Sequence, residues 1–473
     1  MPRLQRLARI THRLRSVRGR WVGRAPRPRR LSPAGWLARW GPIVPLLGAE
    51  FIAWVGFGAL LPVMPLYFTQ HGVDLATLGV IVAAWPAARL VGEPIFGWLA
   101  DRTSRVPIMV GGLVVTGLAL AIPLVFIGAG PFLVMRALAG FATAAYDPAA
   151  RGYLTDATPT DRRGEAFGLY GAAQMGGLML GPAIGGLGAA AFGGFEFVFV
   201  FGAVGTLVAA LAVALRVPEQ PVGPTRARHS PGHDLAEFPI EAPVVYEHAA
   251  DDVERDIERD IETGPGIGSV APRSLWNRLL VAALVLNLGS YFAGATYEVI
   301  WSLYLESKGA GLDFIGFTFA LFGLPVLLFS PIAGRWVDRQ GSYGFLVIGG
   351  VSAAVASVLY PFIALPVQAV PILVVEATGF ALLNPALYAV VAAGSPRGRS
   401  STAQGLYGAA GTVGTIVASI AAGSLAAIDL RFPFWVGGAG MTVCLVACLL
   451  IGGPAIRGRL GRDRRRRPLA IPG

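Results

Sequence analysis

Seven ionisable side chains interrupt the long apolar stretches of this 473-residue chain. They are Glu50, Arg89, Glu93, Arg136, Asp147, Glu298 and Glu376. A charged side chain inside a bilayer costs about 2.5–3.5 kcal/mol on insertion scales, so its presence there indicates a function. A carboxyl group removed from water favours its protonated form, because burial penalises the charge. The chemistry that this set indicates is the binding and release of protons.

The composition places these residues in a membrane protein. Hydrophobic residues make up 54% of the chain and charged residues only 14%, against about 25% charged in soluble domains. A spanning helix needs roughly 20 mostly apolar residues. We expect twelve spans, at residues 43–68, 76–98, 106–128, 131–153, 166–190, 196–215, 277–304, 312–335, 344–365, 368–391, 402–426 and 432–453.

The positive charge is concentrated at the two ends of the chain. Twelve arginines precede residue 40, and seven more lie between Arg457 and Arg467. Cytoplasmic segments next to membrane spans carry an excess of Lys and Arg. We therefore expect a multi-pass protein of the cell (inner) membrane with both termini in the cytoplasm. The same rule explains the net charge of +11 without a nucleic-acid partner.

The two halves of the chain repeat each other at an offset of 237 residues. Asp101-Arg102 aligns with Asp338-Arg339, and the run GLYGAA at 168–173 recurs at 405–410. A single offset kept over this length indicates two structurally related halves.

Three of the carboxylates, Glu50, Glu298 and Glu376, have no ionisable counterpart in the other half. All five histidines lie outside the expected spans, so a proton relay here would use carboxylates. Each of the three is a candidate for proton coupling; the alternative is a hydrogen-bonded or water-exposed acid. Arg89 and Glu93 lie four residues apart on one helix face and are expected to neutralise each other.

The halves define five regions. We expect a basic cytoplasmic tail at 1–41, a six-helix bundle at 42–216, an acidic flexible cytoplasmic linker at 217–275, a second six-helix bundle at 276–453 and a basic cytoplasmic tail at 454–473. The linker is too polar to bury a core of its own. No catalytic set, phosphate loop or metal-spaced His/Cys cluster occurs, so we expect no enzyme, no cofactor and no metal.

Two motifs resemble those of the major facilitator superfamily. The loop GWLADRTSRVPIM (97–109) resembles the signature loop of that superfamily, and GRWVDRQGS (334–342) is a degenerate second copy. The fifth span resembles the antiporter motif of the drug:proton antiporter branch. Its motif residues are Gly177, Gly181, Pro182, Gly185 and Gly186. The resemblance covers about 43–215 and 277–453.

This resemblance implies an all-α membrane protein with twelve transmembrane helices in two six-helix bundles, the major facilitator fold. A substrate cavity would lie between the bundles, which would rock in alternating access. Arg136 and Gly140 fit a further pattern of the family, although Ala139 replaces its usual Gln. By this resemblance, Arg136 would help to tune or move a proton.

A group of charged residues is expected to form a cytoplasmic gate. The group comprises Asp101, Arg102, Arg105, Asp147, Asp338 and Arg339. In the second half Ser342 and Asn384 replace the partners of the first-half cluster together, as a direct contact predicts. The alternative is that these residues only anchor loops.

The glycine motif of the fifth span has no chemistry of its own. Small residues four apart let helix backbones approach closely, and Pro182 removes one helical hydrogen bond. The motif indicates either a seam that limits leak or ordinary close packing.

The function expected is secondary active transport: proton-coupled export of small amphipathic compounds. The partners would be a small-molecule substrate, the lipid bilayer and protons, and we expect a monomer. One alternative is an importer or facilitator of the same fold for a metabolite. The other is a membrane sensor that signals through the linker, which deletion of residues 220–270 would distinguish.

Overall fold

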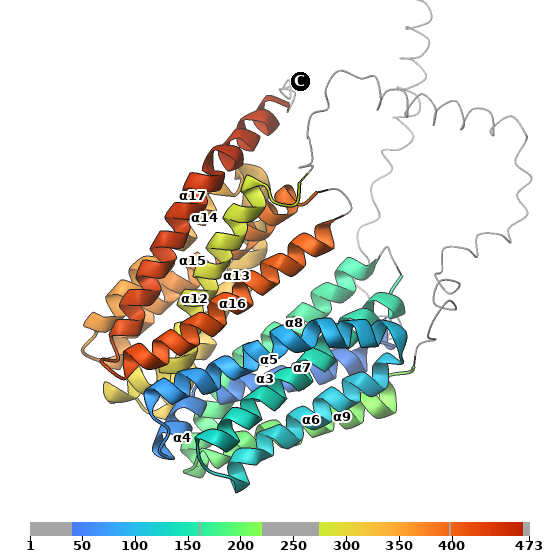
Figure 1. The fold of residues 1–473 in the computed structure, drawn as a ribbon, viewed down its shortest axis with the longest axis vertical. Helices are drawn as coiled ribbons and strands as arrows, with labels where there is room; N and C mark the ends of the chain where they lie inside the picture. Colours follow the sequence, from blue (N-terminus) through green and yellow to red (C-terminus); the bar gives the residue numbers. More distant parts are fainter. Residues whose placement is uncertain (1–39, 160–161, 220–273, 397–398, 467–473) are drawn as a thin grey trace, which may run out of the picture. The chain divides into compact units, whose positions relative to one another are not determined.

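The computed structural model describes residues 40–159, 162–219, 274–396 and 399–466, and these residues form helices and no strands. The first half contains α3 (Val44–Leu60), α4 (Met64–Gln70), α5 (Leu75–Arg102), α6 (Arg105–Val125), α7 (Ala129–Ala157), α8 (Arg163–Phe192) and α9 (Glu196–Arg216). The second contains α12 (Arg278–Ser307), α13 (Leu312–Gln340), α14 (Tyr343–Leu359), α15 (Ala369–Gly394), α16 (Ser400–Ala426) and α17 (Phe432–Arg466), with short 3-10 turns η2 (Tyr360–Phe362) and η3 (Pro366–Gln368). Figure 1 shows these helices in sequence colours. Most of the predicted tails and linker lies outside the described residues.

The helices match the twelve spans expected from the sequence. Within the described part of the chain, ten helices are long and apolar enough to cross a membrane, and α3 with α4 forms an eleventh span that is bent by 45°. The twelfth is the 29-residue α7, which packs against α5 and α6 and carries Arg136, Asp147 and Arg151. The prediction of an all-α fold with twelve helices in two bundles is confirmed.

The break in the first span follows from its prolines. Pro62 has no backbone N–H to continue a helix, and α3 ends at Leu60 before α4 resumes with Pro65 in its first turn. The repeat-related positions hold Val299 and Ser302, and α12 runs through them unbroken.

The sequence repeat reappears in the contacts. The Tyr67 hydroxyl donates to the carbonyl of Pro123 at 2.9 Å, and the Tyr304 hydroxyl donates to that of Tyr360 at 2.7 Å. Both partners of one bond are related to those of the other by the 237-residue offset. The repeat is therefore structural as well as sequential.

The two bundles touch through a pair of glycine contacts that also obey the repeat. A Cβ built on Gly79 of α5 would lie 2.9 Å from the Cα of Gly423 in α16. A Cβ on Gly186 of α8 would lie 3.0 Å from the Cα of Gly316 in α13. Such distances leave no room for a side chain, so the helix backbones themselves are in contact. We call these two contacts the glycine seam.

Candidate functional site

An ion pair joins the two bundles. Arg136 of α7 donates from Nη2 to Glu298 Oε1 of α12 at 2.8 Å and to the carbonyl of Val82 at 3.1 Å. Arg136 is 2% exposed, whereas the Glu298 side chain is 19% exposed. The pair therefore links a buried cation of the first bundle to a carboxylate of the second that water can still reach.

Glu376 of α15 is held by two tyrosines. Its carboxylate accepts hydrogen bonds from Tyr297 at 2.8 Å and from Tyr360 at 2.7 Å. Trp301 packs edge-on against both tyrosine rings. Among the described residues no Lys or Arg lies within ion-pair distance of this acid. Glu376 is therefore a buried acid, 6% exposed, in an aromatic setting and without an ion-pair partner among the described residues.

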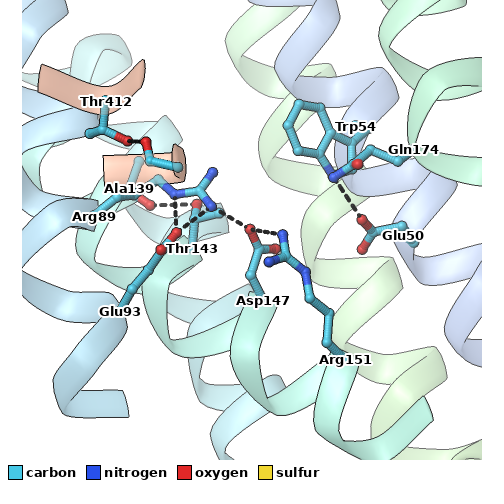
Figure 2. A network of polar contacts seen from close by, with 11 residues as sticks. Glu50, Trp54, Arg89, Glu93, Ala139, Thr143, Asp147, Arg151, Gln174 and Thr412 are labelled. Atoms are coloured by element: carbon cyan, nitrogen blue, oxygen red, sulfur yellow. Dashed lines mark hydrogen bonds and ion pairs between the residues drawn. The ribbon is translucent and has the colours of Figure 1, made fainter. Parts of the chain in front are cut away.

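Glu50 of α3 is completely buried and lies in a second hydrogen-bonded group (Figure 2). Its carboxylate accepts from Trp54 Nε1 at 2.9 Å, from the Tyr170 hydroxyl at 2.7 Å and from Gln174 Nε2 at 3.3 Å. In the second bundle Asn287 occupies the position that corresponds to Glu50. Its side-chain amide donates to the carbonyl of residue 407, the counterpart of Tyr170, at 2.7 Å. Glu50 thus bridges α3 and α8 inside the first bundle.

The glycine motif of α8 divides between two neighbours. A Cβ on Gly177 would lie 2.6 Å from the carbonyl oxygen of residue 51, and one on Gly181 would lie 2.5 Å from that of residue 55. Gly185 likewise meets the backbone of α3, whereas Gly186 meets α13 of the other bundle. Pro182 lies within α8. Three glycines therefore pack the first bundle, and the fourth contributes to the glycine seam.

Asp147 lies in an ion network with α5 (Figure 2). Arg89 Nη2 contacts Asp147 Oδ2 and Glu93 Oε1, each at 2.6 Å. Arg151 approaches the same Asp147 oxygen at 3.7 Å. The expected Arg89–Glu93 pair is present, but the sequence did not indicate Asp147 as its third member.

The remaining residues of the expected gate lie apart from Asp147. Arg105 pairs with Asp156 at 2.7 Å and more distantly with Asp101 at 3.6 Å. No ion pair joins Asp147 to Arg102 or Arg105 in the described part of the chain. Asp156 was not among the expected gate residues, and the repeat places no ionisable residue at its counterpart in the second half.

The other three predicted gate residues are at the ends of α5 and α13. The guanidinium of Arg102 lies 4.3 Å from the centre of the Trp98 ring. Asp338 and Arg339 are exposed, and neither is in an ion pair with another described residue. This arrangement leaves them accessible for contacts in another conformation.

Comparison with known proteins identifies the family. A sequence model described as "Major Facilitator Superfamily" matches residues 46–297 and 279–471. The chain is 27% identical over 413 residues to "Multidrug resistance protein 2" of Bacillus subtilis (strain 168), covering 85% of this chain and 92% of that protein. It is 28% identical over 165 residues to "Quinolone resistance protein NorA" of Staphylococcus aureus (strain MRSA252), covering 35% and 42% of the two chains.

Solved structures share the fold at low sequence identity. A point mutant of the nucleoside transporter NupG superposes with a TM-score of 0.65 at 14% identity, over 86% of this chain and 99% of the other. A bacterial homologue of the human lysosomal transporter Spinster, inward-facing and occupied, gives 0.64 at 14% identity, over 92% and 99%. At these identities the likeness extends to the fold alone.

Proposed function

Because the chain belongs to the Major Facilitator Superfamily, and is therefore a multi-pass membrane transporter with a small-molecule substrate, we propose that it exports amphipathic compounds in exchange for protons. Alternating access of the two bundles would expose the site first to one side of the membrane and then to the other. The relatives named for multidrug and quinolone resistance support this direction and this class of substrate.

The observation that carries the proposal is the ion pair between Arg136 and Glu298. A proton on Glu298 removes its charge, and with it the Coulomb attraction across the bundle interface. Because the two residues belong to different bundles, the protonation of Glu298 changes the relative free energies of the conformations in which the bundles meet or separate here. Proton binding and bundle movement are then coupled through one contact.

The surroundings of Glu376 support a cationic, amphipathic substrate. A carboxylate attracts a cation, while Tyr297, Trp301 and Tyr360 offer aromatic faces to its apolar part. In this proposal Glu376 recognises the substrate, Glu298 exchanges the proton, and Glu50 is a further candidate for coupling.

The proposal also fixes an orientation. The basic ends of the chain lie in the cytoplasm, as the excess of Arg there indicates. Arg105 with Asp101 and Asp156 then belongs to the cytoplasmic gate, and the glycine seam lies toward the outer face. The transporter would act as a monomer in the inner membrane.

Proton flux in inverted vesicles tests the function. The vesicles are energised, and their lumenal acidification is followed as cationic dyes, antibiotics and metabolites are added. We expect particular cations to dissipate the gradient, and Glu298→Gln to reduce this effect at least about tenfold. Glu306→Gln, at an exposed position eight residues along the same helix, is the matched control and should behave like the wild type.

Two results would contradict the proposal. If no compound dissipates the gradient while labelled solute still equilibrates, the protein is a facilitator. If Glu298→Gln and Glu306→Gln behave alike, the proton is carried elsewhere.

Deletion of residues 220–270 should leave transport intact, because neither the ion pair nor the glycine seam involves that segment.

A further inference from the structure

A cavity of about 60 Å³ lies inside the first bundle, between α3, α5, α6, α7 and α9. No described residue of the second bundle lines it. Pockets for drug-sized ligands measure roughly 300–1,000 Å³, so this cavity is too small for the transported compound. A water molecule occupies about 30 Å³ in the liquid. The cavity therefore has room for water.

Three buried polar atoms at this cavity make no hydrogen bond to another described residue: Arg136 Nε, the Tyr146 hydroxyl oxygen and Asp147 Oδ1. Leaving a buried polar atom unsatisfied costs about 1–3 kcal/mol. Cavities with such atoms hold water, whereas dry cavities are apolar. The lining thus calls for ordered water.

One face of α7 supplies the polar lining. Arg136, Thr143 and Asp147 are seven and four residues apart, which places them on the same side of a helix. The Thr143 hydroxyl donates to the carbonyl of Ala139 at 2.7 Å, so its oxygen lone pairs stay free to accept from water. From Arg136 to Asp147 the helix rises about 16 Å over eleven residues. The Arg136 side chain and Thr143 occupy part of that distance, so water has to bridge only the rest.

We propose that water in this cavity relays protons between Glu298 and Asp147, within the first bundle and away from the path of the substrate. The inference rests on the proposed proton coupling. At one end Glu298 contacts Arg136. At the other Asp147 contacts Arg89, which also binds Glu93, a residue whose side chain is 42% exposed.

Each transfer balances. Glu298 does not line the cavity but contacts Arg136, which does. Glu298 gives its proton to a water beside Arg136 as the last water gives one to Asp147, whose Oδ1 is the free acceptor. Arg136 remains protonated throughout. The other charged groups around Asp147 are Arg89, Arg151 and Glu50. Asp147 regains its charge by giving the proton to water, which passes it to Glu93, the partly exposed acid bound to the same Arg89 Nη2, and Glu93 releases it toward the cytoplasm.

Hydroxyl-radical labelling by X-ray radiolysis tests the hydration, because it marks side chains beside bound water. Met135 and Tyr146 line the cavity and are 1% and 3% exposed. We expect them to be labelled severalfold faster than Met441 and Tyr153, which are equally buried, and Ala139→Val, which fills the cavity, to remove the difference. Equal labelling rates in the wild type would show a dry cavity and overturn the inference.

Transport assays test the relay separately. In proteoliposomes, Thr143→Val and Ala139→Val should slow proton-driven export about tenfold while substrate counterflow, which needs no net proton movement, continues. Thr378→Val removes a hydroxyl with the same backbone bond from α15 of the second bundle, away from the cavity, and should change neither. If both activities fall together, or neither falls, there is no relay. If the wild type moves no protons, the proposed function fails with the relay, and labelling still decides the hydration.

Discussion

Gly186 and Gly316 bring α8 and α13 into backbone contact between the bundles, because each would place a Cβ almost on the other helix. The 237-residue offset relates this contact to that of Gly79 with Gly423. The motif residue Gly186 is therefore part of a contact that must separate if the bundles rock at this end. Gly177, Gly181 and Gly185 pack α8 against α3 within the first bundle, whereas Gly186 meets α13 of the second bundle.

Gly186→Ala should shift the protein toward the conformation in which these helix ends are apart. A methyl group here lies 3.0 Å from the Cα of Gly316, a distance that real Cβ atoms rarely show, so the seam cannot close without movement. Double electron–electron resonance measures the distance between spin labels placed at exposed Phe192 and Asp313. In Gly186→Ala a larger fraction of the molecules should show a long distance than in the protein with Gly186.

The control for this substitution lies on the same helix. A Cβ on Gly171 of α8 meets nothing within 4 Å, so Gly171→Ala should leave the distances unchanged. Gly423→Ala should act like Gly186→Ala because the repeat relates their contacts. An unchanged distance distribution in both seam variants would mean that these glycines do not control the separation.

A double-mutant cycle tests the ion pair between Arg136 and Glu298. Arg136→Leu leaves Glu298 without its partner at a largely buried position, and removal of one partner of such a pair costs about 3–5 kcal/mol. Arg136→Leu with Glu298→Leu removes both charges and should recover most of that loss. Denaturation of the four purified proteins measures the free energy of unfolding; additive effects would show that the residues are not coupled.

The sequence predicted the helices well because apolar length is the dominant signal in a membrane. It did not predict that α17 continues from residue 453 to Arg466. Arginines end an apolar pattern, but they are good helix formers, so the helix need not stop where the hydrophobic stretch does. The bend after Leu60 was missed for the opposite reason, since hydropathy runs on through Pro62.

The pairing of Arg136 with Glu298 lay beyond the sequence prediction because the docking of two separate bundles determines it. A partial signal was present. Both residues lack a charged counterpart in the repeat, and their signs are opposite. Arg136 lies seven residues after the start of α7 and Glu298 nine residues before the end of α12, so their depths are similar. The depth of a residue in the membrane can be inferred from a sequence, but which sides of two helices face each other cannot.

The Asp74 cap of α5 gives a pH-dependent prediction outside the spans. Its carboxylate accepts from the Thr77 hydroxyl at 2.6 Å and from the Thr77 N–H at 3.0 Å, and these bonds lower the pKa of Asp74. A carboxylate with a lowered pKa stabilises the folded protein at pH values above its pKa in the unfolded chain, about 3.9. That stabilisation is lost as the pH falls through its pKa in the folded protein. Asp74→Ala should therefore lower the melting temperature at neutral pH.

The same measurement at acid pH is the critical one. The melting temperatures of wild type and Asp74→Ala should converge once the pH falls below the lowered pKa of Asp74 in the folded protein. Asp74→Asn keeps a good helix cap without a titrating group, so its offset from the wild type should be small at neutral pH. A difference between wild type and Asp74→Ala that is constant from neutral to acid pH would exclude the charged cap as its cause.

Glu376 offers a test of charge recognition. If its carboxylate binds the cationic group of a substrate, Glu376→Gln should weaken binding of a cationic dye by about 10- to 150-fold, the equivalent of 1.5–3 kcal/mol for a charged hydrogen bond. A neutral dye of similar size should bind nearly as before. Fluorescence titration of the purified protein with both dyes measures the two dissociation constants.

The tyrosines that hold Glu376 supply the matched variants. Tyr360→Phe keeps the ring but removes the donor at 2.7 Å, so the carboxylate is less well positioned and cation binding should weaken several-fold. Tyr304→Phe removes a hydroxyl that donates to a backbone carbonyl and not to the acid, and it should leave both dyes unaffected. Equal weakening of the cationic and neutral dyes by Glu376→Gln would assign this acid to packing, because a charge-selective site must distinguish the two.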